Sequence, residues 1–152
     1  MSKLWEKGYE LNQIVETFMT GDDPALDLKI AKYDCIASAA HAKMLASIKI
    51  ITQEECGLLV DALDEILLKI ENSEFVIHND DEDIHTAIEN YLTHKLGDTG
   101  KKIHTARSRN DQVLTALRLY MKDQIKVVIA KLTNMLDVLL DFAKKYQNIP
   151  YV

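Results

Sequence analysis

The sequence predicts an all-α protein. It holds only five glycines and two prolines in 152 residues, and it lacks the strict alternation and the turn dipeptides that indicate β-strands. Apolar residues instead recur over long stretches at the three- to four-residue spacing of a helix face. These observations predict an N-terminal helical domain over residues 1–110 and one long helix over residues 111–152.

The first half of the chain carries the start and stop signals of paired helices. Residues 11–19 have the pattern of a short helix with one apolar side. The pair Asp23-Pro24 is typical of an N-cap followed by proline at the first helical position, and it predicts a helix that runs to about Ser47. Thr52 and Glu55 form a capping-box pattern that opens the next helix. Because the connection is short, we expect an antiparallel helical hairpin.

An acidic run precedes a third, shorter helix. Residues 80–83 read Asp-Asp-Glu-Asp, and acidic side chains complement the positive N-terminal end of a helix. The helix should start near Ile84 and end before Gly97, which is a natural C-terminal stop. Residues 97–102 are predicted to form a loop.

The last part of the chain predicts a single long helix. Its apolar residues keep one face from about Asp111 to Tyr146 without a glycine or proline, and Asn110 is the best N-cap candidate. At 1.5 Å per residue the helix would span roughly 54 Å, against a radius of gyration of roughly 15 Å for a compact chain of this size. The helix therefore needs partners of similar length, supplied by self-association or by a larger protein of which this chain is the front part.

Composition narrows the classes of function. The net charge is −6, with 47% apolar and 28% charged residues, so general attraction to nucleic acid or to an anionic membrane is not expected. The first residues lack the apolar segment of a signal peptide, and no apolar run reaches the roughly 20 residues of a membrane helix. Cys35 and Cys56 show no metal-ligand spacing, and we expect both to be reduced in helices of a cytoplasmic protein.

The most informative segment is His104–Gln112. Within nine positions it offers a histidine, two hydroxyls, two guanidinium groups, two amides and a carboxylate. Arginine matches a carboxylate with two parallel hydrogen bonds, and amides at the start of the long helix favour an anion. The segment therefore predicts a site for a small anionic molecule. Two plainer interpretations stay open: a solvated loop that ties two helix ends together, and an i,i+4 ion pair of Arg107 with Asp111.

His85 is the second chemical candidate. It follows the acidic run and precedes Glu89 by one helical turn, so it could donate or carry a proton near neutrality. The alternative is a surface histidine in a charged helix start. Metal binding is less favoured, because His85 and Glu89 are only two ligands. Ser108 lacks the glycines of a nucleophile elbow, and the remaining histidines, His41, His78 and His94, are interpreted as surface or packing residues.

Three segments also carry a family resemblance. Residues 104–113, HTARSRNDQV, closely resemble the HT(G/A)RSRNDQV signature of the argininosuccinate lyases, which belong to the fumarase/aspartase superfamily. Residues 82–85, EDIH, resemble the EDxH motif that this family places some twenty residues earlier. Residues 33–41, YDCIASAAH, are similar to its first long helix. The resemblance covers essentially the whole chain and identifies it with the N-terminal portion of the family.

The resemblance implies an all-helical homotetramer in which segments from three subunits meet at each active site. The implied reaction is the reversible β-elimination of argininosuccinate to arginine and fumarate, the step of arginine biosynthesis that the urea cycle shares, without metal or organic cofactor. By position, the implied substrate-binding residues are Arg109 and Asn110, which would hold carboxylates, with Ser108 and Thr105 in the same pocket. Asp83 and His85 are the implied catalytic candidates, in the polar network around the leaving group.

The chain departs from the family pattern at two places. The N-terminal Trp-Gly-Gly-Arg-Phe of the family reads Trp-Glu-Lys-Gly-Tyr at residues 5–9, and the Ser-x-x-x-Asp pattern that contacts substrate is matched only by Thr20 and Asp27 at a longer spacing. Of these, Asp27 is the expected substrate-binding residue. The chain also stops before the family's Thr-His segment and its Ser-Ser-x-Met-Pro loop. We therefore expect the 152-residue piece to be inactive alone.

Three alternatives remain beside an argininosuccinate lyase. One is a sister enzyme that acts on another fumarate adduct, which the RSRNDQ spelling disfavours. Another is a non-catalytic helical oligomer, like the lens crystallins recruited from this family, because a binding pocket can outlive its chemistry. The last is an oligomerisation module built on the long helix, which would leave the His104–Gln112 segment unexplained.

Overall fold

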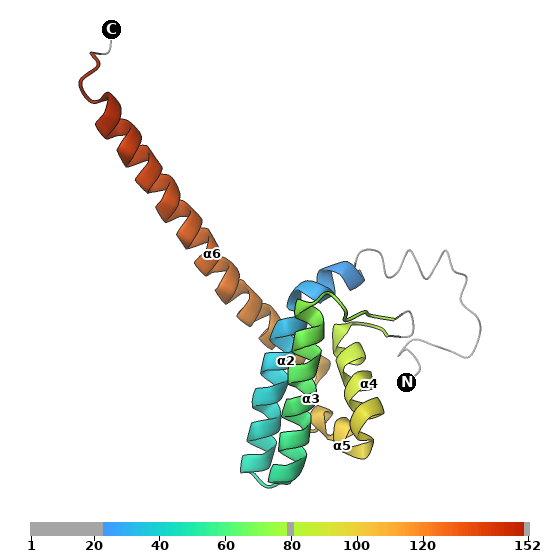
Figure 1. Cartoon of the computed structure of the whole chain (residues 1–152). Coiled ribbons are helices and arrows are strands. Elements are labelled where there is room, and N and C mark those ends of the chain that lie inside the picture. Colours follow the sequence, from blue (N-terminus) through green and yellow to red (C-terminus); the bar gives the residue numbers. More distant parts are fainter. Residues whose placement is uncertain (1–22, 79–80, 151–152) are drawn as a thin grey trace. The chain divides into compact units, whose positions relative to one another are not determined.

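The computed structural model describes residues 23–78 and 81–150, and these residues form helices and connections without a β-strand. The all-α prediction is confirmed. The chain divides into two units, Met1–Leu117 and Arg118–Val152, which are described separately. The predicted helix over residues 11–19 lies outside the described residues. In chain order the elements are α2 (Asp23–Ser47), α3 (Gln53–Glu71), α4 (Ile84–Leu96), α5 (Asp98–Lys101), the 3₁₀ turn η1 (Lys102–His104) and α6 (Arg109–Tyr146) (Figure 1).

Helices α2 and α3 form the predicted antiparallel hairpin (Figure 1). The capping box at the start of α3 is complete: the Glu55 amide donates to Thr52 Oγ1 at 3.1 Å, and the Thr52 amide donates to Glu55 Oε2 at 2.9 Å. In the tight connection Lys49 has a φ of 63°, in the left-handed region. The local signals for this hairpin were therefore read correctly from the sequence.

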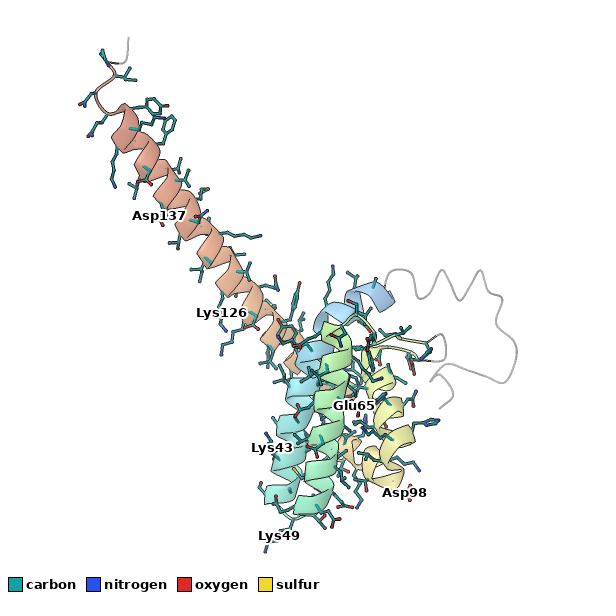
Figure 2. The ribbon with its side chains drawn as sticks, viewed as in Figure 1. Lys43, Lys49, Glu65, Asp98, Lys126 and Asp137 are labelled. Atoms are coloured by element: carbon teal, nitrogen blue, oxygen red, sulfur yellow. The ribbon has the colours of Figure 1, made fainter. Side chains whose placement is uncertain are left out.

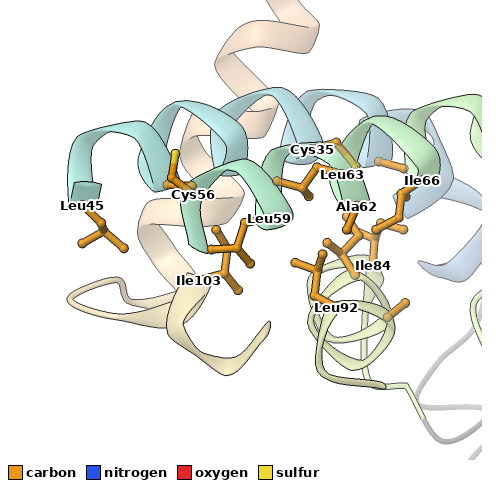
Figure 3. Close-up of a cluster of buried hydrophobic side chains, with 14 of the residues drawn as sticks. Cys35, Leu45, Cys56, Leu59, Ala62, Leu63, Ile66, Ile84, Leu92 and Ile103 are labelled. Atoms are coloured by element: carbon orange, nitrogen blue, oxygen red, sulfur yellow. The ribbon is translucent and has the colours of Figure 1, made fainter. Parts of the chain in front are cut away.

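One apolar core holds α2, α3 and α4 together, and it also takes in Ile103 of η1. Figure 3 shows the side chains of these elements meeting, with Leu59 beside Ile103 and Ala62 beside Ile84. Each fully buried aliphatic side chain contributes about 1.5–3 kcal/mol relative to an exposed one. The largest fully buried apolar members are Leu45, Leu59, Leu63, Ile66, Ile84 and Leu92.

Residues 97–102 do not form the predicted loop. Gly97, with a φ of 60°, ends α4, and the chain turns at once into α5 and η1. The turn depends on packing rather than on local propensity, since a Cβ on Gly100 would lie 2.2 Å from the carbonyl oxygen of Leu92. Only a residue without a side chain lets α5 approach the backbone of α4 this closely.

Helix α6 begins two residues earlier than predicted, and Asn110 is not its N-cap. The Ser108 amide donates to Asp111 Oδ2 at 3.0 Å, and the Asp111 amide reaches Ser108 Oγ at 3.4 Å. This reciprocal pair is a capping box with aspartate in place of glutamate. Ser108 therefore caps the helix, and Asn110 lies exposed in its first turn.

In the second unit, α6 is exposed except at Leu119, Tyr120 and Asp123, which are of intermediate exposure. Charged side chains such as Lys126 and Asp137 project from it (Figure 2). Its large apolar side chains are also about half exposed, among them Ile125, Leu132, Met135, Leu139 and Phe142. Within residues 23–78 and 81–150, no helix combines the length and hydropathy that crossing a bilayer requires.

Candidate anion-binding site

The candidate site lies within the first unit, where α4 and α6 begin. Arg109, the first residue of α6, reaches across to α4: its Nε lies 3.3 Å from Asp83 Oδ2, and its Nη2 donates to Thr86 Oγ1 at 2.9 Å. A third contact stays on α6, where Nη1 donates to Gln112 Oε1 at 3.3 Å. The two predicted site residues Arg109 and Asp83 are therefore brought together.

Arg109 retains hydrogen-bonding capacity. A guanidinium group has five N–H donors. Among the described residues, Arg109 makes two hydrogen bonds, and its Nε forms an ion pair with Asp83. The side chain is 32% exposed, and Asn110 and Ser108 beside it are exposed as well. Free donors next to the start of α6 form a surface suited to a carboxylate.

The start of α4 is already capped by carboxylates. Asp83 Oδ1 accepts from the Thr86 amide at 2.7 Å, and Asp27 Oδ2, from α2, accepts from the Ile84 amide at 3.1 Å. These bonds satisfy two of the amides that a helix start leaves open. The structure thus places Asp27 beside Asp83, and an external anion would meet the start of α6 rather than that of α4.

Behind the surface lies a buried polar cluster. Asp34 and Ser38 of α2 and His85 of α4 are 0%, 1% and 2% exposed. His85 Nδ1 lies 3.1 Å from Asp34 Oδ2, and Arg107 Nη2 lies 3.7 Å from Asp34 Oδ1. Arg107 Nη1 also donates to Ser38 Oγ at 2.9 Å.

This cluster corrects two interpretations of the sequence. His85 is not a surface histidine, and Arg107 does not fold back on Asp111 but turns inward to Asp34 and Ser38. Burial lowers the pKa of Arg107, and the negative charge of Asp34 opposes that shift. The two arginines of the segment therefore differ in role, with Arg107 inward and Arg109 toward the surface.

Further contacts hold the His104–Gln112 segment against the helices. His41 Nε2 donates to the Thr105 carbonyl at 2.9 Å, and His104 Nδ1 lies 3.3 Å from Glu89 Oε2. Burial lowers the pKa of His41, although the Thr105 carbonyl acts in the opposite sense. His41 is thus a neighbour of the segment, and the sequence interpretation did not predict this contact.

A helical pattern could have revealed these partners. Asp34, Ser38 and His41 are spaced i, i+4 and i+7, which places them on one face of α2. That face contacts the segment at each of the three positions. A polar stripe within the otherwise apolar residues 34–42 is the signal. Thr86 carried no comparable signal, because it is a single polar residue whose role depends on where Arg109 reaches. Gln112 belongs to the predicted segment, and its contact with Arg109 stays on α6.

The described residues offer neither a metal site nor a reactive thiol. Among the described residues, no group of three or more histidine, cysteine or acidic side chains is placed to hold a metal ion. Cys35 and Cys56 are free, and they lie in α2 and α3, as expected; both are also buried. Burial, together with the charge of Asp34, raises the pKa of the Cys35 thiol, so this thiol remains protonated and unreactive.

A helical chain with arginine, amide and carboxylate groups at two helix starts fits a class of enzymes that handle small carboxylates. A family model described as a lyase matches residues 15–152, and the chain belongs to this lyase family. Curated relatives named argininosuccinate lyase match nearly all of it. The protein from Thermotoga neapolitana is 50% identical over 98% of this chain and 37% of the relative.

Two further relatives of the same name come from other bacteria. The protein from Bacteroides fragilis is 44% identical over 97% of this chain and 33% of its own length, and that from Xanthomonas campestris is 44% identical over 97% and 34%. The resemblance to argininosuccinate lyases is confirmed. The chain spans about a third of the length of these relatives.

Proposed function

We propose that this chain supplies the substrate-anchoring part of an argininosuccinate lyase, which reversibly eliminates fumarate from argininosuccinate and releases arginine. The observation that carries the proposal is the environment of Arg109. Asp83 and Thr86 fix its side chain, and within residues 23–78 and 81–150 it keeps N–H donors without a partner at an exposed helix start. The proposed reaction is taken from the name argininosuccinate lyase, which relatives at 42–50% identity carry.

The chemistry of the elimination suits this arrangement. The substrate carries several carboxylates, and the reaction passes through a carbanion whose charge spreads onto one of them. Arg109 and Asn110 are proposed to hold these carboxylates, with Ser108 and Thr105 lining the same pocket and Asp27 beside it. Donors held in place before the reaction stabilise the developing charge without reorganising.

Asp83 and His85 are proposed to belong to the polar network around the leaving group. Asp83 is half-buried and paired with Arg109, so it can contact a bound molecule, whereas His85 lies behind it in the core. We propose no metal or organic cofactor. The remaining catalytic groups would come from segments outside this chain. The 152 residues alone should therefore not convert argininosuccinate.

The wider context is proposed in the same way. The apolar side chains of α6 are about half exposed, which suits burial against other long helices. This supports a homotetramer. In it, this chain would form an N-terminal domain and the first long helix of a central bundle. Two free, buried cysteines suit a reducing compartment, in support of a cytoplasmic enzyme of arginine biosynthesis.

A chimaera tests the proposal. Residues 1–152 would replace the matching region of the Thermotoga neapolitana relative, and release of fumarate from argininosuccinate would be measured. We expect the chimaera to be active and the isolated chain to be inactive. Asn110→Ala in the chimaera should lower the rate without unfolding it, because this side chain is exposed.

Two results would contradict the proposal. One is a folded chimaera, with the relative's oligomeric state, that releases no fumarate, which would favour a non-catalytic helical protein. The other is measurable turnover by the isolated chain, which would show that the missing segments are not needed.

A further inference from the structure

Asp34 is a charged residue in the middle of α2 that contacts two other segments of the site region. Its carboxylate is fully buried. One oxygen lies 3.1 Å from His85 Nδ1, and the other lies 3.7 Å from Arg107 Nη2. Each oxygen therefore faces a different segment of the chain.

The two segments are those that begin the site's helices. His85 is the second residue of α4, and Arg107 lies two residues before α6 starts at Arg109. A shift of either residue relative to Asp34 would move one helix start against the other. The contacts of Arg109 with Asp83 and Thr86 span that same gap, so they depend on the register that Asp34 sets.

The charge of Asp34 makes this register specific. A buried guanidinium group needs a compensating carboxylate, because an unpaired buried charge is costly. Ser38 offers Arg107 a neutral hydrogen bond on the same helix face, but a hydroxyl cannot balance its charge. Asp34 therefore determines where Arg107 lies, and with it the backbone that presents Arg109 and Asn110.

We propose that Asp34 is a positioning residue of the substrate site: it aligns the starts of α4 and α6 so that Arg109 meets a substrate carboxylate. It acts through His85 and Arg107 and does not touch substrate. This inference rests on the proposed function, and it adds a residue of α2 that the sequence patterns had not assigned to the site.

The experiment uses the chimaera with Asp34→Asn, which keeps the shape of the side chain and removes its charge. We expect KM for argininosuccinate to rise, with kcat/KM falling on the order of tenfold to a hundredfold, as displacement of an anchoring group does. Asp61→Asn makes the same chemical change at an exposed position of α3, and it should leave KM unchanged. In an Arg109→Ala background, Asp34→Asn should add little further, because its effect passes through Arg109.

A second variant separates positioning from simple charge balance. Asp34→Asn combined with Arg107→Gln removes both buried charges and leaves two amides that can hydrogen-bond. We expect the urea midpoint of this double variant to lie closer to that of the parent chimaera than the midpoint of Asp34→Asn alone does. Its KM for argininosuccinate should stay raised. This variant also keeps the inference testable if Asp34→Asn alone fails to fold.

Several outcomes would overturn the inference. The first is an unchanged KM in folded Asp34→Asn, and the second is a double variant that restores KM together with stability. The third is full additivity of Asp34→Asn with Arg109→Ala. Loss of folded structure in both Asp34 variants would assign Asp34 to the fold alone. An inactive parent chimaera would instead refute the proposed function, so the two failures are distinguishable.

Discussion

The contact of Gly100 with α4 yields a prediction whose magnitude follows from the structure. A Cβ at this position would lie 2.2 Å from the Leu92 carbonyl oxygen and 2.6 Å from the Thr93 amide nitrogen, and contacts below 3.0 Å essentially never occur. Both neighbours are backbone atoms, so no side chain can rotate away. In Gly100→Ala, α5 must separate from α4 by about 1 Å, and overpacking of this kind costs about 1–3 kcal/mol.

The matched control is Gly57→Ala in α3. A Cβ there meets nothing within 4 Å, and alanine is favoured over glycine inside a helix by about 0.5–1 kcal/mol. The same chemical change should therefore stabilise at residue 57 and destabilise at residue 100.

Urea unfolding of the chain, followed by helical circular dichroism, gives both free energies of unfolding. A Gly100→Ala chain as stable as the parent would refute the packing argument. Since η1 follows α5 directly, Gly100→Ala in the chimaera should also raise KM by displacing the His104–Gln112 segment.

Two further predictions concern the site and its pH dependence. In the chimaera, Arg109→Ala should lower kcat/KM by an amount equivalent to about 2–4 kcal/mol, as loss of a charge-assisted anchor does. Arg109→Lys should recover only part of that kcat/KM, because an ammonium group lacks the planar fork of a guanidinium group. Unchanged kinetics in Arg109→Ala would remove Arg109 from the site. Burial lowers the pKa of His41 below its ordinary 6.5, so the unfolded chain binds a proton more readily, and the stability present above pH 6.5 should decline as pH falls below it. His41→Gln keeps a donor for the Thr105 carbonyl and should flatten that decline in urea midpoints measured on either side of pH 6.5; an equally steep decline would show that other groups cause it.

Local chemistry explains which parts of the fold were predictable. The capping box of Thr52 and Glu55 and the helix stop at Gly97 each depend on only a few neighbouring residues. Both are present in the structure as predicted. The turn formed by α5 was missed because four residues of ordinary composition become helical only through packing on α4. The start of α6 was misplaced because Ser108 and Asn110 are both good caps, and the reciprocal bond with Asp111 decides between them.

The candidate site was predictable at its surface and not at its base. Arg109 and Asp83 stand in dense polar segments, so their chemistry is visible in the sequence. The direction of each arginine is not visible, because it depends on partners from α2 that are distant in sequence. Asp34 and Ser38 draw Arg107 inward. Their helical spacing marks one face of α2, but it does not say which later segment packs against that face.

The buried cluster around Asp34 is an inefficient way to gain stability. Taking a carboxylate and a guanidinium group out of water costs several kcal/mol for each ion, and well-packed apolar side chains often replace such groups without loss. Apolar side chains could therefore hold α2, α4 and the segment before α6 together equally well. They could not fix direction, because dispersion contacts tolerate small rotations that a carboxylate held between an imidazole and a guanidinium group does not. The energetic cost of the cluster is thus understandable if the cluster serves to orient Arg109. When the charges of Asp34 and Arg107 are removed together, the stability should therefore be largely retained while the substrate affinity falls.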